Sequence, residues 1–149
     1  MLQLNLTLTP ALKKVLKKHK VEVVYLFGSQ AEGGANALSD VDVGVVFRDI
    51  RAKNKDPSGI FTELYEAFRC ALEIPASQRL DLVYLEEAPL RLQMNAIKHG
   101  KVLYQESEEI RTDYEDYATM QYLDWKYSDD LYLKEVAEEI TGKKIELEA

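Results

Sequence analysis

The sequence predicts an α/β fold: a small sheet covered by helices, followed by a helical C-terminal segment. Short runs rich in β-branched and aromatic residues alternate with longer stretches whose apolar residues recur at helical spacing. An alternation of this kind packs helices against a sheet, and 149 residues suffice for one domain. We therefore expect a single domain over 1–149, with a core over about 1–105 and a helical segment over about 106–149.

The first half of the chain predicts two helices and two strands. Each helix is expected to begin at a capping residue followed by proline, Thr9-Pro10 in one case and Asp56-Pro57 in the other. Two short β-branched runs, separated by a loop that contains glycines, read as strands. The expected elements are a helix over 10–20, strands over 21–27 and 40–47, and a helix from 57 whose apolar stripe runs to 72.

The second half predicts a strand over 80–85, a helix, a short edge strand over 102–104 and a long helical segment from 107 to about 140. Pro89 opens the first of these helices, and Gly100 is expected to close it as a left-handed C′ residue. The pair Ser128-Asp129 is a candidate break in the long segment. Its candidate contact stripe consists of Tyr114, Tyr117, Tyr122, Trp125, Tyr132 and Val136.

Composition argues against several classes of protein. The net charge of −7 repels a nucleic-acid backbone and favours a cationic small molecule or a basic protein partner. No apolar run approaches the ~20 residues that cross a bilayer. The single cysteine, Cys70, cannot form an internal disulfide, and with only His19 and His99 beside it a zinc site is not expected. The first residues lack signal-peptide character, so we expect a cytoplasmic protein.

Gly28-Ser29 follows directly after the first expected strand. A glycine there lets the backbone turn sharply and lets a phosphate approach the main chain. Free N–H groups beyond the turn and the Ser29 hydroxyl could then bind the anion. Alone, the pair is most simply a turn that ends a strand.

Three aspartates have strand positions that suit a cation. Asp40 and Asp42 are two residues apart, so both carboxylates lie on one face of the second strand. Asp81 is a lone acid in the apolar run of the third strand. Carboxylate oxygens suit Mg²⁺, which also recruits phosphates. Taken singly, these residues also fit a polar strand mouth and an exposed edge position; together with the Gly-Ser turn they are far more specific.

The segment over 26–47, LFGSQAEGGANALSDVDVGVVF, resembles the signature of the polymerase β-type nucleotidyltransferase superfamily. It is similar in particular to the minimal nucleotidyltransferases (MNT), which include antitoxins encoded beside HEPN-domain ribonuclease toxins. The segments IKHGKVLYQ and YEDYATMQYLDWKY also resemble parts of that group. The resemblance implies the small mixed sheet of the nucleotidyltransferase fold, flanked by helices.

The resemblance also implies roles for matching residues. Gly28 and Ser29 would hold the β- and γ-phosphates of ATP, and Asp40 and Asp42 would bind two Mg²⁺ ions. Asp81 would share one metal and act as the base toward an acceptor hydroxyl. Two departures are Gln30 and Glu32, where many relatives carry basic residues; Glu32 would repel a triphosphate and slow turnover. Because all three acids are kept, we expect an active enzyme.

The implied activity is Mg²⁺-dependent transfer of AMP from ATP to a hydroxyl, with a tyrosine of a cognate HEPN toxin as acceptor. In that case the aromatic C-terminal stripe would be a partner surface, although packing within the chain also accounts for such residues. One alternative is modification of a small aminoglycoside-like molecule. Another is a non-catalytic antitoxin that acts by binding alone.

Overall fold

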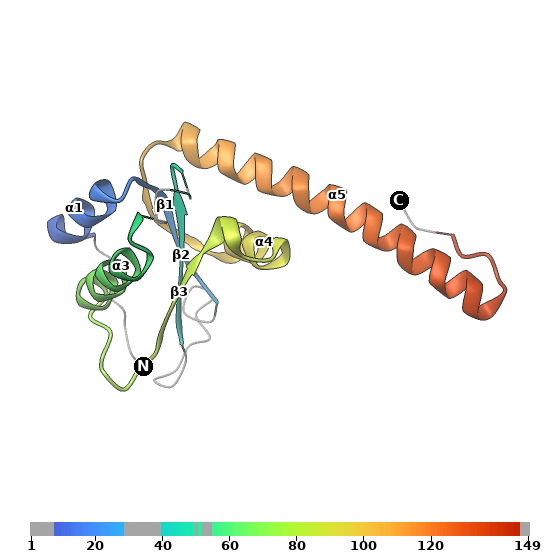
Figure 1. Ribbon diagram of the computed structural model, residues 1–149, viewed down its shortest axis with the longest axis horizontal. Coiled ribbons are helices and arrows are strands. Elements are labelled where there is room, and N and C mark those ends of the chain that lie inside the picture. The colour runs from blue at the N-terminus through green and yellow to red at the C-terminus, as the bar shows by residue number, and fades with distance from the viewer. Residues whose placement is uncertain (1–7, 29–39, 50, 52–54, 147–149) are drawn as a thin grey trace.

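The computed structural model describes residues 8–28, 40–49, 51 and 55–146 (Figure 1). In chain order, the helices and strands are α1 (Pro10–Lys18), β1 (Val21–Phe27), β2 (Val41–Phe47), α3 (Pro57–Ala71), β3 (Leu80–Tyr84), the 3-10 turn η2 (Leu85–Glu87), α4 (Leu90–His99), β4 (Lys101–Gln105) and α5 (Glu108–Thr141). This order confirms the predicted α/β fold class, and boundaries differ from expectation by a residue or two at most elements.

The strands form one mixed sheet in the order β3-β2-β1-β4. β1 runs antiparallel to both β2 and β4, whereas β2 and β3 are parallel. Within the described residues β4 is an edge strand, as predicted for this segment. Figure 1 shows α1 and α3 on one side of the sheet and α4 on the other. Both faces are therefore covered, which explains why the strand sequences are almost continuously apolar.

Alternation along each strand divides the core into two layers. On the α1/α3 side, Val41, Val43 and Val45 of β2 are fully buried with the apolar residues of both helices. On the α4 side, Val23, Tyr25 and Phe27 of β1 form the second layer. Each strand is thus held by side chains on both faces, which makes the sheet a rigid support for any group at its ends.

The predicted helix starts are confirmed. The Thr9 hydroxyl accepts a hydrogen bond from the Leu12 N–H at 3.1 Å, and a carboxylate oxygen of Asp56 accepts one from Gly59 at 3.2 Å. Proline follows at the first helical positions of α1 and α3. These local bonds satisfy backbone donors that a helix N-terminus leaves unpaired.

Gly100 ends α4 for a different reason from the one expected. Its φ of −77° and ψ of 166° are extended, not left-handed. A Cβ at this position would overlap the Ala96 carbonyl oxygen and lie 3.1 Å from the Leu26 carbonyl oxygen. The glycine is required chiefly because the last turn of α4 itself leaves no room for a Cβ, and the nearby β1 backbone closes the other side.

The expected break at Ser128-Asp129 is wrong, because α5 continues through it as one helix of 34 residues. Serine and aspartate lower helix propensity only slightly, and no proline or glycine interrupts the helix. At about 1.5 Å per residue the helix is about 50 Å long, and Figure 1 shows its C-terminal half projecting beyond the sheet. None of the described helices has the length and apolar character needed to span a membrane.

We predict that Gly100→Ala lowers the free energy of unfolding by about 1–3 kcal/mol, because a new methyl group would press on backbone that cannot easily move. Urea unfolding of the purified variant measures this. The control is Lys98→Ala at an exposed position of α4, which should change stability by less than about 0.5 kcal/mol. Equal stabilities of the two variants would contradict the close approach.

Candidate active site

Three strand ends meet at one end of the sheet. Because β1 is antiparallel to β2, the last residue of β1 lies beside the start of β2, and Phe27 pairs with Asp42. Because β2 and β3 are parallel, their first residues also lie side by side, and Asp42 pairs with Asp81. Asp42 is therefore the central position, with the end of β1 on one side and Asp81 on the other.

The structure brings the three predicted aspartates into one electrostatic cluster. Asp42 is partly buried, whereas Asp40 and Asp81 are exposed. A side-chain hydrogen bond joins the carboxyl groups of Asp42 and Asp81, which requires a proton on one of the two. Burial, followed by the negative charges of Asp81 and Asp40, raises the pKa of Asp42 to about 6. At neutral pH Asp42 is therefore ionised, although burial and the neighbouring negative charges disfavour its charged form.

Gly28 directly follows β1 and lies against Asp42 at the same end of the sheet. Its φ of +72° lies in the left-handed region, and a Cβ on it would overlap the Asp42 carboxylate. Both the backbone conformation and the lack of space require glycine at this position. The strand-ending turn is thus built against Asp42. Ser29, Gln30 and Glu32 lie outside the described residues.

The pair of carboxyl groups fits a hard divalent cation chemically. A cation between Asp42 and Asp81 would replace the shared proton and remove the repulsion that raises the pKa of Asp42. In the part of the chain that is described, no three His, Cys, Asp or Glu side chains are arranged to hold a metal ion together. The donor set is an open one, of the kind that suits Mg²⁺, which uses one or two carboxylates and completes its shell with water and phosphate oxygens.

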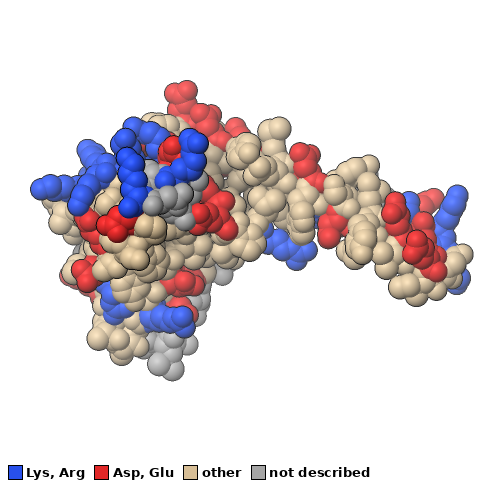
Figure 2. All heavy atoms as spheres, viewed as in Figure 1, with Lys and Arg blue, Asp and Glu red and all other residues tan. Residues whose placement is uncertain are grey.

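A larger hollow, of about 940 Å³, lies between α1, β4 and the start of α5. Its lining includes Lys13, Lys17 and Arg111, and Figure 2 shows Lys and Arg side chains gathered over α1 at the left of the molecule. This hollow adjoins the end of β4 that lies beside the start of β1, away from the aspartates. None of the three aspartates lines this hollow, so we place the candidate active site at the other end of the sheet, where Asp42 and Asp81 lie.

Sequence reasoning missed two charged groups that the structure makes conspicuous. Glu86 is largely buried, accepts a hydrogen bond from the Phe47 N–H at 2.8 Å, and has its pKa raised to about 7 chiefly by burial. Arg79 begins the β3 side of the candidate site, where its carbonyl oxygen accepts from the Val41 N–H at 2.9 Å. The sequence could have indicated Arg79, because it lies two residues before Asp81 and strand alternation therefore places both on one face.

A mixed sheet that presents a carboxylate pair beside a glycine turn at one end is the architecture of a nucleotidyltransferase. Residues 11–109, more than half of the chain, match the polymerase beta nucleotidyltransferase family, and the chain belongs to that family. No curated protein sequence matches the chain significantly.

Several solved structures share the fold. A chain of a toxin–antitoxin crystal structure with AMP-PNP is 23% identical with a TM-score of 0.61, and the match covers 85% of this chain and 96% of that chain. A second is a complex of a tri-AMPylated HEPN toxin with MNT antitoxin from Shewanella oneidensis, with 22% identity, a TM-score of 0.55, and coverage of 84% and 92%. A third is the toxin–antitoxin MntA-HepT, with 22% identity, a TM-score of 0.54 and the same coverage of 84% and 92%.

We predict that Asp42→Asn stabilises the metal-free protein at pH 7, by about 1 kcal/mol after allowance for solvent screening. In the folded protein the pKa of Asp42 is raised from 3.8 to about 6, so its contribution to stability is present below about pH 4 and is lost as the pH rises through 6. The gain from Asp42→Asn should therefore shrink when the pH is lowered from 7 to 4.

Denaturant unfolding at both pH values, without and with Mg²⁺, measures this. Glu66→Gln is the control, since it removes one negative charge from an exposed position of α3, and it should show no such pH dependence. A variant at Asp42 that is less stable than the unaltered protein at pH 7 would show that the carboxylates do not repel each other.

Proposed function

We propose that the protein transfers AMP from ATP to the hydroxyl of a tyrosine on a HEPN-domain toxin, and that it acts in this way as a cytoplasmic antitoxin. The observation that carries the proposal is the contact between Asp42 and Asp81 beside Gly28. Membership of the nucleotidyltransferase family supports the reaction class. The tri-AMPylated HEPN toxin in complex with an MNT antitoxin supports the acceptor.

In the proposed reaction the acceptor oxygen bonds to the α-phosphorus of ATP, the bond from that phosphorus to the bridging oxygen breaks, and pyrophosphate leaves. Asp40 and Asp42 would hold two Mg²⁺ ions, and Gly28 and Ser29 would bind the polyphosphate. The ions would supply charge stabilisation to the entering and leaving oxygens. Asp81 would share one ion and would accept the proton of the acceptor hydroxyl. Rigid strands hold these groups, which suits a reaction that depends on positioning and charge neutralisation.

A protein acceptor is supported by the surface of α5. Among the residues of the expected stripe, Tyr114 packs within the molecule, where its ring centroid lies 6.3 Å from that of Tyr25. Further along, Tyr117 and Tyr132 are each 63% exposed. Packing within the chain therefore accounts for the start of the stripe and leaves most of the rest free to contact a partner.

The side of α5 that faces α4 also forms a hollow of about 490 Å³, lined by Pro89, Leu90, Arg91, Trp125 and Asp129. The Arg91 guanidinium lies 5.3 Å from the centre of the Trp125 ring. Aromatic and arginine side chains with apolar neighbours are typical of the residues that dominate protein interfaces. Figure 2 shows uncharged surface between the charged groups along this projecting helix.

A non-catalytic antitoxin is the second candidate, because the sequence carries a negative charge at Glu32, four residues after Gly28, where many relatives are basic. The same α5 surface would serve it. The two candidates differ in one result: only the enzyme increases the mass of the toxin by one AMP for each modified tyrosine.

We predict that Asp81→Asn lowers the rate of transfer at least ~100-fold, the usual contribution of a positioned base, while Mg-ATP still binds. A second prediction concerns the other two acids. Asp40→Ala and Asp42→Ala should each abolish transfer without unfolding the protein, because each substitution removes a proposed metal ligand and no core side chain. The assay uses labelled ATP, Mg²⁺ and the purified product of the adjacent gene, which the proposal expects to be a HEPN toxin. Glu66→Gln should transfer normally, and a normal rate for Asp81→Asn would show that Asp81 is only structural.

We also predict that the double substitution Tyr132→Ala, Leu133→Ala weakens binding of the same toxin at least ~10-fold, because it removes exposed apolar surface from the free half of α5. Calorimetry with purified components measures this. Leu123→Ala removes a similarly exposed side chain on a different side of the helix and is the matched control. Unchanged binding by the double variant would exclude this surface.

A further inference from the structure

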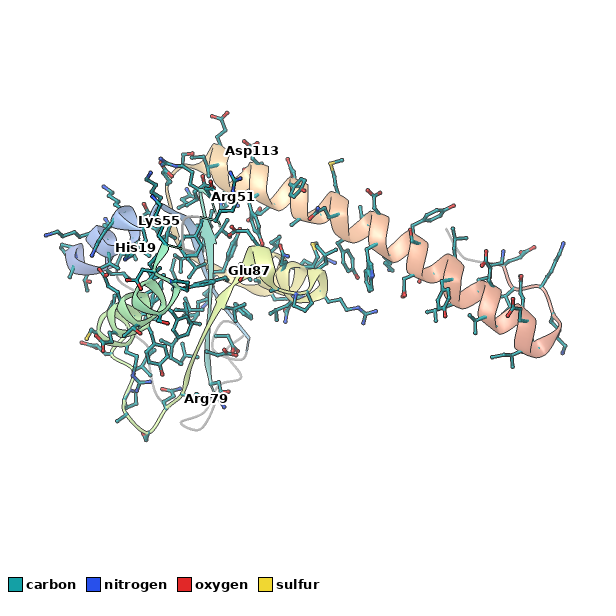
Figure 3. The ribbon with its side chains drawn as sticks, viewed as in Figure 1. His19, Arg51, Lys55, Arg79, Glu87 and Asp113 are labelled. Carbon is teal, nitrogen blue, oxygen red and sulfur yellow. The ribbon has the colours of Figure 1, made fainter. Side chains whose placement is uncertain are left out.

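Arg79 lies directly before β3, at the end of the sheet that carries the three aspartates. Its carbonyl oxygen accepts a hydrogen bond from the Val41 N–H at 2.9 Å. The parallel pairs Val41–Leu80 and Asp42–Asp81, continued back by one residue, set Arg79 beside Asp40. Its side chain is exposed, and Figure 3 shows it at the end of the sheet where β2 and β3 begin. Arg79 thus puts next to the carboxylates a positive charge that does not depend on pH.

The Arg79 guanidinium is free to bind a ligand. Within the described ranges it makes neither a hydrogen bond nor an ion pair, even though Asp40 and Asp81 are its neighbours. Arg69, which packs near the same loop, is in the opposite situation. Its guanidinium donates to the Gln78 carbonyl at 3.1 Å and to the Pro75 carbonyl at 2.7 Å, so it is committed to the backbone. Arg79 has no such structural task.

The electrostatics of the site call for a cation at this position. A polyphosphate that enters here meets the carboxylates of Asp40, Asp42 and Asp81, which lie together where β2 and β3 begin. Two divalent ions cannot neutralise both the polyphosphate and the carboxylates, so a net negative charge remains. A guanidinium offers paired N–H donors that match phosphate oxygens, and its charge does not depend on pH.

We propose that Arg79 binds the polyphosphate of the nucleotide at this site. The proposal rests on the proposed function only in taking a nucleoside triphosphate as the ligand. It adds a binding residue from β3 to a phosphate site that the sequence pattern assigned to the end of β1 alone. Arg79 would thereby supply positive charge that Gln30 and Glu32 do not.

The test is calorimetric titration of the full-length protein with AMP-PNP and Mg²⁺, without any acceptor. Arg79→Gln should weaken binding at least ~10-fold, as expected for loss of hydrogen bonds to a charged group, and Arg79→Lys should weaken it less. Binding of AMP should change little in either variant, because AMP lacks the β- and γ-phosphates. Thermal unfolding of each variant checks that the fold is intact.

Lys101→Gln is the matched control. It removes one positive charge from the same end of the sheet, where Lys101 pairs with Leu26, but on β4, which is about 14 Å from β3 across two strands. Equal losses in the two variants, or unchanged affinity of Arg79→Gln, would overturn the inference. If the unaltered protein fails to bind Mg-AMP-PNP, the proposed function fails instead. If Arg79→Gln leaves the affinity for AMP-PNP unchanged and raises the KM for the acceptor in the transfer assay, Arg79 is an acceptor contact and the inference is wrong.

Discussion

The parallel register of β2 and β3, which pairs Asp42 with Asp81, is the constraint on which the candidate active site depends. Two carboxyl groups come together only because β2 and β3 are parallel and in one particular register. A shift of one residue would turn one of the two side chains to the opposite face of the sheet. The proposed metal site and the place of Arg79 follow from that register, whereas the antiparallel pairing of β1 with β2 sets the position of Gly28.

Apolar side chains buried on the opposite face of β2 offset the free-energy cost of bringing the two carboxyl groups together. Raising the pKa of Asp42 from 3.8 to about 6 corresponds to no more than about 3 kcal/mol, and less after solvent screening. Val41, Val43 and Val45 are fully buried on the α1/α3 side, and burying one such side chain contributes about 1.5–3 kcal/mol. Core packing therefore outweighs the local repulsion and holds the carboxylates where a cation can use them.

The long helix α5 is anchored to the sheet at its start and is exposed along the rest of its length. At its start, the Tyr25 hydroxyl donates to a Glu115 carboxylate oxygen at 2.8 Å, and Arg111 pairs with the same carboxylate at 3.0 Å. These contacts anchor α5 to β1 through a partly buried network. Beyond Ala118, the described residues of α5 are at most partly buried, so the apolar side chains there stabilise the monomer little. Their exposure on the surface is the physical basis for the proposal that a partner covers them.

The amino-acid sequence by itself determined the helix starts, the alternation of the strands and the identity of the candidate site residues. These depend on interactions within a few residues, such as the Thr9 cap and the two-residue spacing of Asp40 and Asp42. Only the tertiary structure decided that Asp42 meets Asp81, and that Arg79 lies beside the acids with no ion pair among the described residues. Each of these depends on contacts between segments distant in the chain, and no local pattern specifies the register in which such segments pack.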